Sequence, residues 1–545
     1  MTDFSKLTPE QLEKMDKQVL ITIIGALQGQ LNTISSQINF LTEQIALMNQ
    51  RSFGRKTEKK DSIPNQLSFS DYFDNEDVFN EPEYLSDSSK EPEITEVIIS
   101  SYTRKKKTSR EANLEGLPAR VFEHTIEADR LKELFPNGYK ELPVETYKRL
   151  AMIPQTFLVD EHHIHVYASK DNDGTIIRAE RPKDLFRNSI ATASVVSVMM
   201  NAKFANHQPL ERQVQFFKNF GVNLKTNTAA NWMINASEQY LLIIYDELHK
   251  HLYDSEVIHA DETPFQVIRD DRSPGSKSYM WVYRNGACSA SHPVIIYDYQ
   301  STRKTDHPEE FLKNYNGVLV TDGYQVYHTL ANKREGLKVA GCWVHAKRKY
   351  SEIVKALGKE KADLPDGIIA AKAEDKISKI FHEDNLLDGL SKRERKKQRQ
   401  KKVKPLVDKF FEWVKQSILK LPAESATAKA LQYSINQEDY LRVFLSDPNV
   451  PMDNNPAEQS IRPFTLGRKN WVAINSPKGA DASAVIYSLV ETAKANHLSV
   501  QAYLEYLLTE IPKLRDDNGK MDDAKLDALM PWSKELPDEL RIPRR

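Results

Sequence analysis

The sequence predicts a mixed α/β protein with long helical additions around its sheet. Between residues 254 and 350, short apolar runs typical of buried strands alternate with helical segments, and residues 186–253 and 351–450 have a helical character. The chain has 545 residues, which at roughly 100–200 residues per domain predicts about three or four domains. Its net charge of −1 gives no global sign of a nucleic-acid partner, so evidence for one must be local. Two cysteines exclude a disulfide framework and a cysteine-rich zinc site.

Residues 1–60 carry an apolar repeat with alternating spacings of four and three residues. This spacing produces one narrow apolar seam, as a coiled coil requires, and we expect residues 1–60 to form a coiled-coil segment that makes the protein a homo-oligomer. An amphipathic helix packed on its own domain is the alternative. The seam consists of Leu20, Ile24, Leu27, Leu31, Ile34, Ile38, Leu41, Ile45 and Met48.

Residues 61–110 differ in composition from the rest of the chain. Residues 61–100 contain eleven acidic residues and one basic residue, a net charge of −10, with little periodicity. Such a stretch cannot bury enough apolar surface to fold, so we predict an acidic disordered linker. It ends in a basic cluster that begins at Arg104–Lys107.

A small β-rich module is predicted at 111–185, followed by a helical region at 186–253. The strand-like runs of the module are Thr146–Met152, Thr156–Val159 and His163–Ala168. In the helical region, two helical stretches, 209–219 and 226–234, flank a turn at Gly221. This arrangement fits a helix-turn-helix and fits a plain αα-hairpin equally well.

Residues 254–350 are predicted to start a ribonuclease-H-like catalytic core that resumes at 451–510. The order is three strands, a helix, a fourth strand and a helix, which corresponds to an antiparallel meander and a crossover to a strand parallel to the first. The strands are expected at Glu256–Asp261, Tyr279–Arg284, His292–Tyr299 and Gly317–Gly323, and the helices at Pro308–Tyr315 and Trp343–Leu357.

Residues 351–450 form a predicted helical, basic insertion in this core, and 511–545 a polar C-terminal tail. The insertion contains residues 392–404, the basic segment, with nine bases and one acid. The segment is either a solvated helix face or a surface that faces DNA or RNA.

Three acidic residues have positions that suit metal-dependent phosphodiester chemistry. Asp261 and Asp322 end the first and fourth strands, which are neighbours in the predicted fold although 61 residues separate them. Glu458 begins a later helix, and three carboxylates suit a pair of Mg²⁺ ions about 3.5–4 Å apart. Each also has a structural explanation: a strand end for Asp261, a turn for Asp322 and a capping box for Glu458.

Several neighbouring residues are candidate DNA contacts. Basic side chains neutralise phosphates, and a tryptophan stacks on an unpaired base. Cys342 and His345 have C-x-x-H spacing, but two ligands make a poor zinc site, so we expect a structural or DNA-positioning role. The expected DNA-binding residues are Arg462, Arg468, Lys469, Trp471, His345 and Arg348.

Long motifs in this order closely resemble the bacterial DDE transposases of the insertion-sequence-66 family, nearly from end to end. The resemblance implies a transposase that cuts and joins DNA with Asp261, Asp322 and Glu458 as its metal-binding acids, with Glu491 as the alternative third acid. It also implies that the first segment is a leucine zipper. The motifs are His259–Pro264, Thr321–Tyr324, Gly341–Tyr350, Asp453–Glu458, Ile461–Pro463, Gly467–Trp471, Tyr487–Asn496 and Leu529–Trp532, with Phe53–Lys59 after the coil.

The family pattern and this sequence differ in the β-rich module. The family usually carries paired cysteines there, which form a zinc finger, whereas the corresponding stretches here contain none. We therefore expect a zinc-finger-like module without its metal, Mg²⁺ or Mn²⁺ as the cofactor, and no zinc.

The expected partners and location follow from the same evidence. The partners are terminal-repeat DNA, target DNA and accessory proteins of the same element. The sequence shows neither a signal peptide nor an apolar stretch of about 18 residues, so we expect no membrane and a cytoplasmic, nucleoid-associated protein. The alternatives are a non-catalytic DNA-binding regulator, an inactive transposase relative and a nuclease relative that cleaves without joining.

Overall fold

The computed structural model describes most of the chain from residue 183 onwards. The described ranges are 183–542, without 274, 287–291, 359–363 and 515–520, and the short pieces 16–21, 24–25, 28–31, 37, 129–130, 136–137, 156–168 and 176–180. The chain divides into two compact units, one formed by 1–54 with 161–545 and one by 55–160. All helices and strands from residue 166 onwards belong to the first unit.

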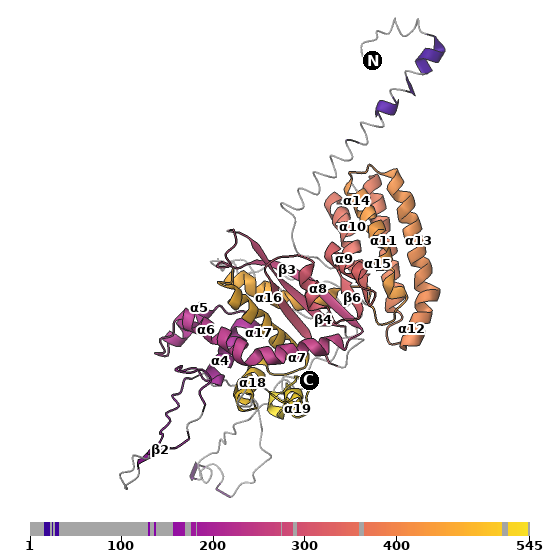
Figure 1. Cartoon of the computed structure of the whole chain (residues 1–545). Coiled ribbons are helices and arrows are strands. Elements are labelled where there is room, and N and C mark those ends of the chain that lie inside the picture. Colours follow the sequence, from indigo (N-terminus) through magenta and orange to yellow (C-terminus); the bar gives the residue numbers. More distant parts are fainter. Residues whose placement is uncertain are drawn as a thin grey trace. The chain divides into compact units, whose positions relative to one another are not determined.

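A mixed five-stranded sheet forms the centre of this unit (Figure 1), which confirms the predicted mixed α/β class. The strand order is β5-β4-β3-β6-β7. The first three strands pair antiparallel, β6 pairs parallel to β3, and β7 pairs parallel to β6. The strands are β3 (Val257–Gln266), β4 (Lys277–Asn285), β5 (Ile295–Gln300), β6 (Gly317–Thr321) and β7 (Leu337–Gly341).

Strand β3 changes partners along its length. Its apolar first half, Val257–Ala260, is buried between β4 and β6, and the parallel register with β6 ends at His259 opposite Val320. The antiparallel ladder with β4 continues to Gln266. The prediction that the strand ends at Asp261 is therefore wrong, because Asp261 marks the point just beyond the parallel pairing while the strand itself runs on.

Three helices connect or follow the parallel strands. They are α8 (Asp306–Phe311) between β5 and β6, α9 (Gln325–Lys333) between β6 and β7, and α10 (Trp343–Leu357) after β7. The sequence analysis missed α9 and β7. Strand β7 has only five residues, one of them an exposed lysine, so its apolar signal is weak.

Helices that precede and follow the sheet in the sequence pack against it. Helix α16 (Asn455–Trp471) packs against β3 and β4, while α17 (Pro477–Ala495) and α7 (Leu242–Tyr253) pack against β5. The hydroxyl groups of Ser488 and Thr492 on α17 accept backbone N–H groups of the edge strand β5 at 2.8 and 3.0 Å. These bonds satisfy donors that an open edge exposes. Helix α18 (Val500–Leu514), which overlaps the predicted tail, packs against α4 (Ala193–Met200), and α19 (Asp523–Ala528) follows it.

The helical region before the sheet contains α5 (Leu210–Lys218) and α6 (Thr226–Ala236). Gly221 in the turn between them has a φ of 81°, a conformation that favours glycine. The Thr226 hydroxyl donates to the Glu211 carboxylate at 2.6 Å and ties the two helices together. Helix α6 packs against α17 and buries Trp232 and Met233.

Residues 364–450 form a helical bundle that packs on α10 beside the sheet (Figure 1). Trp343 of α10 lies in its core with Phe410, Phe411 and Phe444. The helices are α11 (Pro365–Asn385), α12 (Lys392–Gln398), the π-helical turn η8 (Arg399–Val403), α13 (Lys404–Ser417), α14 (Ala426–Asn436) and α15 (Glu438–Leu441).

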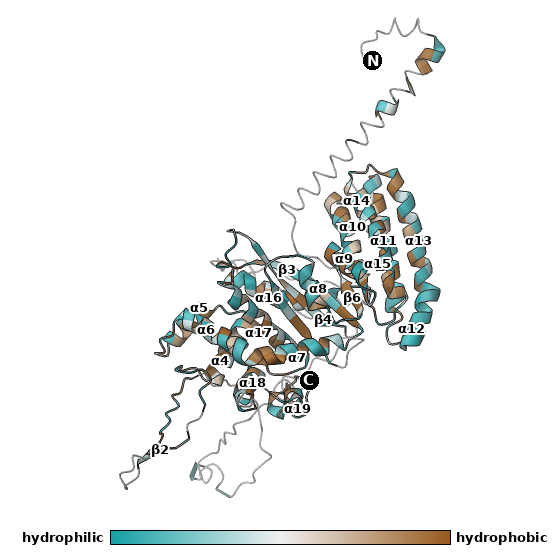
Figure 2. Cartoon of the chain, in the orientation of Figure 1, coloured by the Kyte–Doolittle hydropathy of each residue, from teal (hydrophilic) through white to brown (hydrophobic). Residues whose placement is uncertain are grey.

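The basic segment is not uniformly exposed. Helix α12 is hydrophilic along its length (Figure 2) and contains no buried residue. Arg399, however, is fully buried: it pairs with Asp384 at 2.7 Å and donates to the carbonyl groups of Phe444, Asp447 and Val450. Arg399, one of the nine basic residues, therefore stabilises the bundle and is not available to contact DNA.

The described pieces before residue 183 test the earlier predictions only in part. Strands β1 (Val166–Ala168) and β2 (Ile176–Arg178) pair antiparallel, but residues 156–165 contain no strand, so the prediction of one at 156–159 is wrong. The run 146–152 lies outside the described residues. Pieces 17–21, 24–25 and 28–31 are helical, and the seam residues Ile24 and Leu31 are 54% and 64% exposed. Within the described residues, no helix has the length and apolar content needed to cross a membrane.

Candidate active site

Two aspartates lie where the parallel strands β3 and β6 stop pairing. Asp261 comes two residues after the last residue of β3 that pairs with β6, and Asp322 comes directly after β6. Each carboxylate accepts a nearby backbone N–H group at 2.9 Å, from Glu262 and from Tyr324 respectively. Adjacent parallel strands place their ends at one edge of the sheet, and this brings the two carboxylates to the same side.

The turn after Asp322 depends on a glycine and on the helical bundle. Gly323 has a φ of 92°, and a Cβ atom there would lie 2.8 Å from the hydroxyl oxygen of Tyr433. Tyr433, on α14, donates its hydroxyl to the carbonyl group of Asp322 at 3.0 Å. The bundle thus helps to fix the position of one candidate metal ligand.

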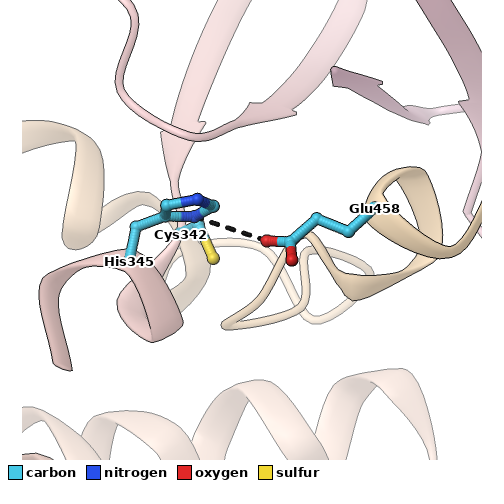
Figure 3. A group of neighbouring side chains, drawn as sticks. All are labelled: Cys342, His345 and Glu458. Atoms are coloured by element: carbon cyan, nitrogen blue, oxygen red, sulfur yellow. Dashed lines mark ion pairs between the residues drawn. The ribbon is translucent and has the colours of Figure 1, made fainter. Parts of the chain in front are cut away.

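Glu458 reaches the same region from the first turns of α16. The helix begins at Asn455 with Asn454 as its N-cap, and Asp453 accepts the N–H group of Asn455 at 3.0 Å. The capping-box explanation of Glu458 is therefore wrong, because its side chain points instead toward α10. There Arg348 donates to Glu458 Oε2 at 3.3 Å, and His345 Nδ1 lies 3.6 Å from Glu458 Oε1 (Figure 3).

The three predicted acids influence one another electrostatically. Burial raises the pKa of Asp261 well above its usual value, and the negative charges of Glu262, Asp322 and Glu458 raise this pKa further. Like charges have such an effect only when they are close together. A site of this kind favours a cation, and carboxylate oxygens are the ligands that Mg²⁺ and Mn²⁺ prefer. The donor set therefore fits a hard divalent metal.

A fourth carboxylate, Glu262, was missed by the sequence analysis. Burial and the charge of Asp322 raise its pKa, while Arg303 and a hydrogen bond from Tyr327 oppose that rise. The Arg303 guanidinium pairs with Glu262 Oε1, and the Tyr327 hydroxyl donates to Oε2 at 2.9 Å. In the described part of the chain, the charges named as acting on its neighbour Asp261 are all negative, so Glu262 has a cationic partner in the protein while Asp261 fits a metal ion.

Asn454 fastens the start of α16 to the sheet. Its Oδ1 accepts a hydrogen bond from the Nδ1–H group of His259 at 2.9 Å, and its Nδ2 donates to the carbonyl group of Ala260 at 2.8 Å. Its backbone N–H group donates to Cys342 Sγ at 3.2 Å. Burial lowers the pKa of His259 to about 4, so this imidazole is neutral at pH 7. The network positions Glu458 relative to Asp261 without adding charge.

A cleft of about 290 Å³ opens beside Asp322. Four of its lining side chains are basic or imidazole groups, which suits a phosphate held near the carboxylates. The Arg303 guanidinium stacks 3.6 Å above the ring of Tyr324, and Lys349 lies 4.4 Å from the ring of Tyr433. The lining residues are Arg303, Asp322, Gly323, Tyr324, His345, Arg348, Lys349, Glu352 and Tyr433.

The predicted DNA-binding residues of α16 divide into two groups. Arg462 and Lys469 are exposed. Arg468 instead donates to the Thr263 hydroxyl at 3.2 Å and to the carbonyl group of Pro264, and Trp471 packs edge-on against Phe464. The hydrogen bonds of Arg468 attach α16 to β3, and Trp471 packs within α16 itself.

Glu491, the alternative third acid, lies elsewhere. It is buried on α17, where it pairs with Lys494 at 2.8 Å, and Arg284 also acts on its charge. It is not among the groups that shift the pKa of Asp261. The carboxylate that approaches the two aspartates is that of Glu458.

Comparisons with known families match most of the chain. The model described as "Transposase IS66 family" matches residues 188–482, which include the sheet, the bundle and all three acids. The model described as "IS66 C-terminal element" matches 488–532, and the model described as "Transposase C of IS166 homeodomain" matches 40–121.

Related sequences occur in Sinorhizobium fredii. The uncharacterized protein y4hP is 27% identical over 400 residues, which cover 72% of this chain and 71% of the relative. The uncharacterized protein y4qI is 27% identical over 395 residues, with 71% and 70% covered. Because the transposase model alone spans more than half of the 545 residues and the other two extend the match on either side, the chain belongs to the IS66 transposase family.

Proposed function

We propose that this protein is a DDE transposase that cleaves DNA at the ends of an insertion sequence and joins those ends to target DNA. The observation that carries the proposal is the placement of Asp261 and Asp322 on neighbouring parallel strands, with Glu458 on α16 close enough for its charge to act on Asp261. Family membership supports transposition and DNA binding in general. The three-carboxylate arrangement supports the specific chemistry.

The fold of the catalytic core is proposed to be ribonuclease-H-like. The strand order β5-β4-β3-β6-β7 supports this, because three antiparallel strands are followed by a crossover to β6, parallel to the first strand. The core is interrupted by the helical bundle between β7 and α16, which brings Glu458 back to the sheet. The exposed apolar positions in the first helical pieces support a coiled coil that joins copies of the chain.

Asp261, Asp322 and Glu458 would hold Mg²⁺ or Mn²⁺. Bound divalent cations supply Lewis acidity for activating the attacking oxygen and stabilising charge on the phosphate. The protein's own cations complete the site: Arg348 lies against Glu458 and at the cleft, and Arg303 offsets the charge of Glu262. Exposed Arg462 and Lys469 on α16 are proposed to hold flanking phosphates.

The proposed reaction consists of two in-line displacements at phosphorus. In the first, a water oxygen loses a proton and bonds to the phosphorus, the bond from phosphorus to the 3′ oxygen breaks, and that oxygen takes up a proton to become a free 3′-OH. In the second, this 3′-OH loses its proton and its oxygen bonds to a phosphorus of the target strand, while the target's own 3′ oxygen leaves and takes up a proton. No oxidant or reductant is needed.

The test compares Glu458→Gln with Glu491→Gln in cleavage of labelled element-end DNA. Glu458→Gln keeps the shape of the side chain but removes a charged metal ligand, so we expect activity to fall by about 10³-fold, with the fold and DNA binding nearly intact. Glu491→Gln, the matched control, is expected to retain most activity because Glu491 is occupied with Lys494.

The opposite ranking would assign the third acid to Glu491. Full cleavage by both variants and by Asp261→Asn and Asp322→Asn would refute the proposal and favour a non-catalytic DNA-binding regulator. Cleavage without joining in a strand-transfer assay would identify a nuclease.

A further inference from the structure

Three potential metal ligands of a second kind meet beside the carboxylate site. Cys342 ends the loop after β7, His345 lies in the first turn of α10, and Glu458 lies on α16 (Figure 3). One ligand atom of each lies within 4.8 Å of the others. The sequence analysis considered Cys342 and His345 a poor zinc site because they supply only two ligands. The third ligand comes from a residue more than 110 positions away in the chain.

Two of the three ligand atoms are left without hydrogen bonds. His345 Nδ1 and Glu458 Oε1 are both buried and have no hydrogen-bond partner among the described residues, although they face each other at 3.6 Å. Buried polar atoms are rarely unsatisfied, and each such atom calls for an explanation. Zn–N and Zn–O bonds of about 2.0–2.2 Å in a tetrahedral arrangement separate the two ligand atoms by about 3.4 Å. The observed separation thus already suits an ion between them.

The sulfur atom of Cys342 lies within reach of the other two ligand atoms. Cys342 is buried, and the backbone N–H group of Asn454 donates to its Sγ at 3.2 Å. Burial raises the pKa of the Cys342 thiol to about 12, and the donated hydrogen bonds only partly oppose this rise, so zinc must displace the thiol proton when it binds. Arg348 opposes a cation here, but it bonds Oε2 of Glu458 and leaves Oε1 to the cluster.

We propose that Cys342, His345 and Glu458 form a zinc site, with a fourth position open to water, distinct from the proposed Mg²⁺ site of Asp261 and Asp322. Sulfur and imidazole ligands select zinc over magnesium, whereas an all-carboxylate site has the reverse preference. Glu458 belongs to both sets and cannot serve both fully. Zinc bound at this site therefore withdraws Glu458 from the catalytic metals and inhibits DNA cleavage; this consequence, unlike the binding itself, rests on the proposed function.

The first experiment tests binding alone, with cobalt(II) as a spectroscopic substitute and zinc(II) as its competitor. Wild-type full-length protein is expected to show a sulfur-to-cobalt charge-transfer band that zinc abolishes. Cys342→Ser is expected to lose the band and to bind zinc more than about 10-fold more weakly, since even indirect perturbation of a metal site costs about 10–100-fold. Cys288→Ser, at the chain's other cysteine, is the matched control and should retain both properties.

Because Cys342 is buried, the zinc affinity of Cys342→Ser is compared with that of the wild type only if the two proteins have the same melting curve. Glu458→Gln is the second ligand variant. It leaves the sulfur in place and is expected to weaken zinc binding by a similar factor. Wild-type protein that shows no sulfur-to-cobalt band, or equal zinc affinity for Cys342→Ser and Cys288→Ser, overturns the site.

The second experiment measures cleavage at fixed Mg²⁺ with increasing zinc. We expect zinc to inhibit cleavage by the wild type and higher Mg²⁺ to relieve this inhibition. If zinc inhibits Cys342→Ser as strongly as the wild type, each relative to its own zinc-free rate, the competition between the two metals is contradicted. If no cleavage occurs in any condition while the sulfur-to-cobalt band is present, the zinc site stands and the proposed transposase chemistry fails.

Discussion

Replacing Asp261 by asparagine is expected to abolish DNA cleavage and at the same time to stabilise the metal-free protein. The folded-state pKa of Asp261 lies well above its usual value because of burial and because of Glu262, Asp322 and Glu458. Ionisation is therefore more costly in the folded than in the unfolded state, and the free energy of unfolding falls as the pH rises through the folded-state pKa. Asparagine resembles the protonated carboxyl group and avoids this loss.

The size of both effects follows from the site. Each unit of pKa difference corresponds to about 1.4 kcal/mol, and each kcal/mol raises the melting temperature by about 2–4 °C in a domain of about 150–250 residues. The stabilisation should be present at pH 8 in a chelator and should disappear near pH 3, below the usual aspartate pKa of about 3.9, where the carboxyl group is protonated in both states. Cleavage should fall by about 10³-fold, since a metal's charge stabilisation is worth several kcal/mol.

Thermal melts across this pH range, with and without Mg²⁺, test the reasoning. Mg²⁺ is expected to raise the melting temperature of the wild type more than that of the variant, because binding to the folded state alone stabilises it. A variant that melts below the wild type at pH 8 in the chelator would refute the electrostatic argument, as would a difference that does not change with pH.

Three further predictions concern parts of the chain outside the site. Replacing Leu31 and Ile38 by lysine puts charge into the apolar seam and should reduce the mass measured by light scattering; an unchanged oligomer would rule out the coiled coil. Replacing the exposed bases of the basic segment by glutamine should flatten the plot of log affinity against log salt by about 0.9 for each base that contacts a phosphate, and an unchanged slope would remove this segment from the DNA interface. Arg399→Leu should destabilise the bundle by about 3–5 kcal/mol in denaturant titrations, because buried Asp384 would keep only its longer pairing with Arg395 at 3.4 Å and the carbonyl groups of Phe444 and Val450 would lose their donor; a loss below about 1 kcal/mol would contradict the role assigned to this pair.

Much of the sheet was predictable because strands β3 to β6 are continuous apolar runs bounded by turn residues. Such runs are a local signal, and local signals can be read without knowledge of the rest of the fold. Strand β7 escaped prediction because it is short and carries a lysine. The end of β3 was misplaced because the sequence changes character where one partner strand is lost, while the other partner keeps the strand extended.

The candidate acids were predictable in identity, whereas their surroundings were not. The sequence by itself determined that two carboxylates follow the apolar runs of two strands and that a third begins a late helix. Only the tertiary structure decided that Glu458 faces α10 instead of capping its own helix, that Arg303 forms an ion pair with Glu262, and that Arg399 is buried. These outcomes depend on contacts between residues far apart in the chain, such as the 110 positions between Arg348 and Glu458. Charge and burial belong to such contacts, and a local pattern does not contain them.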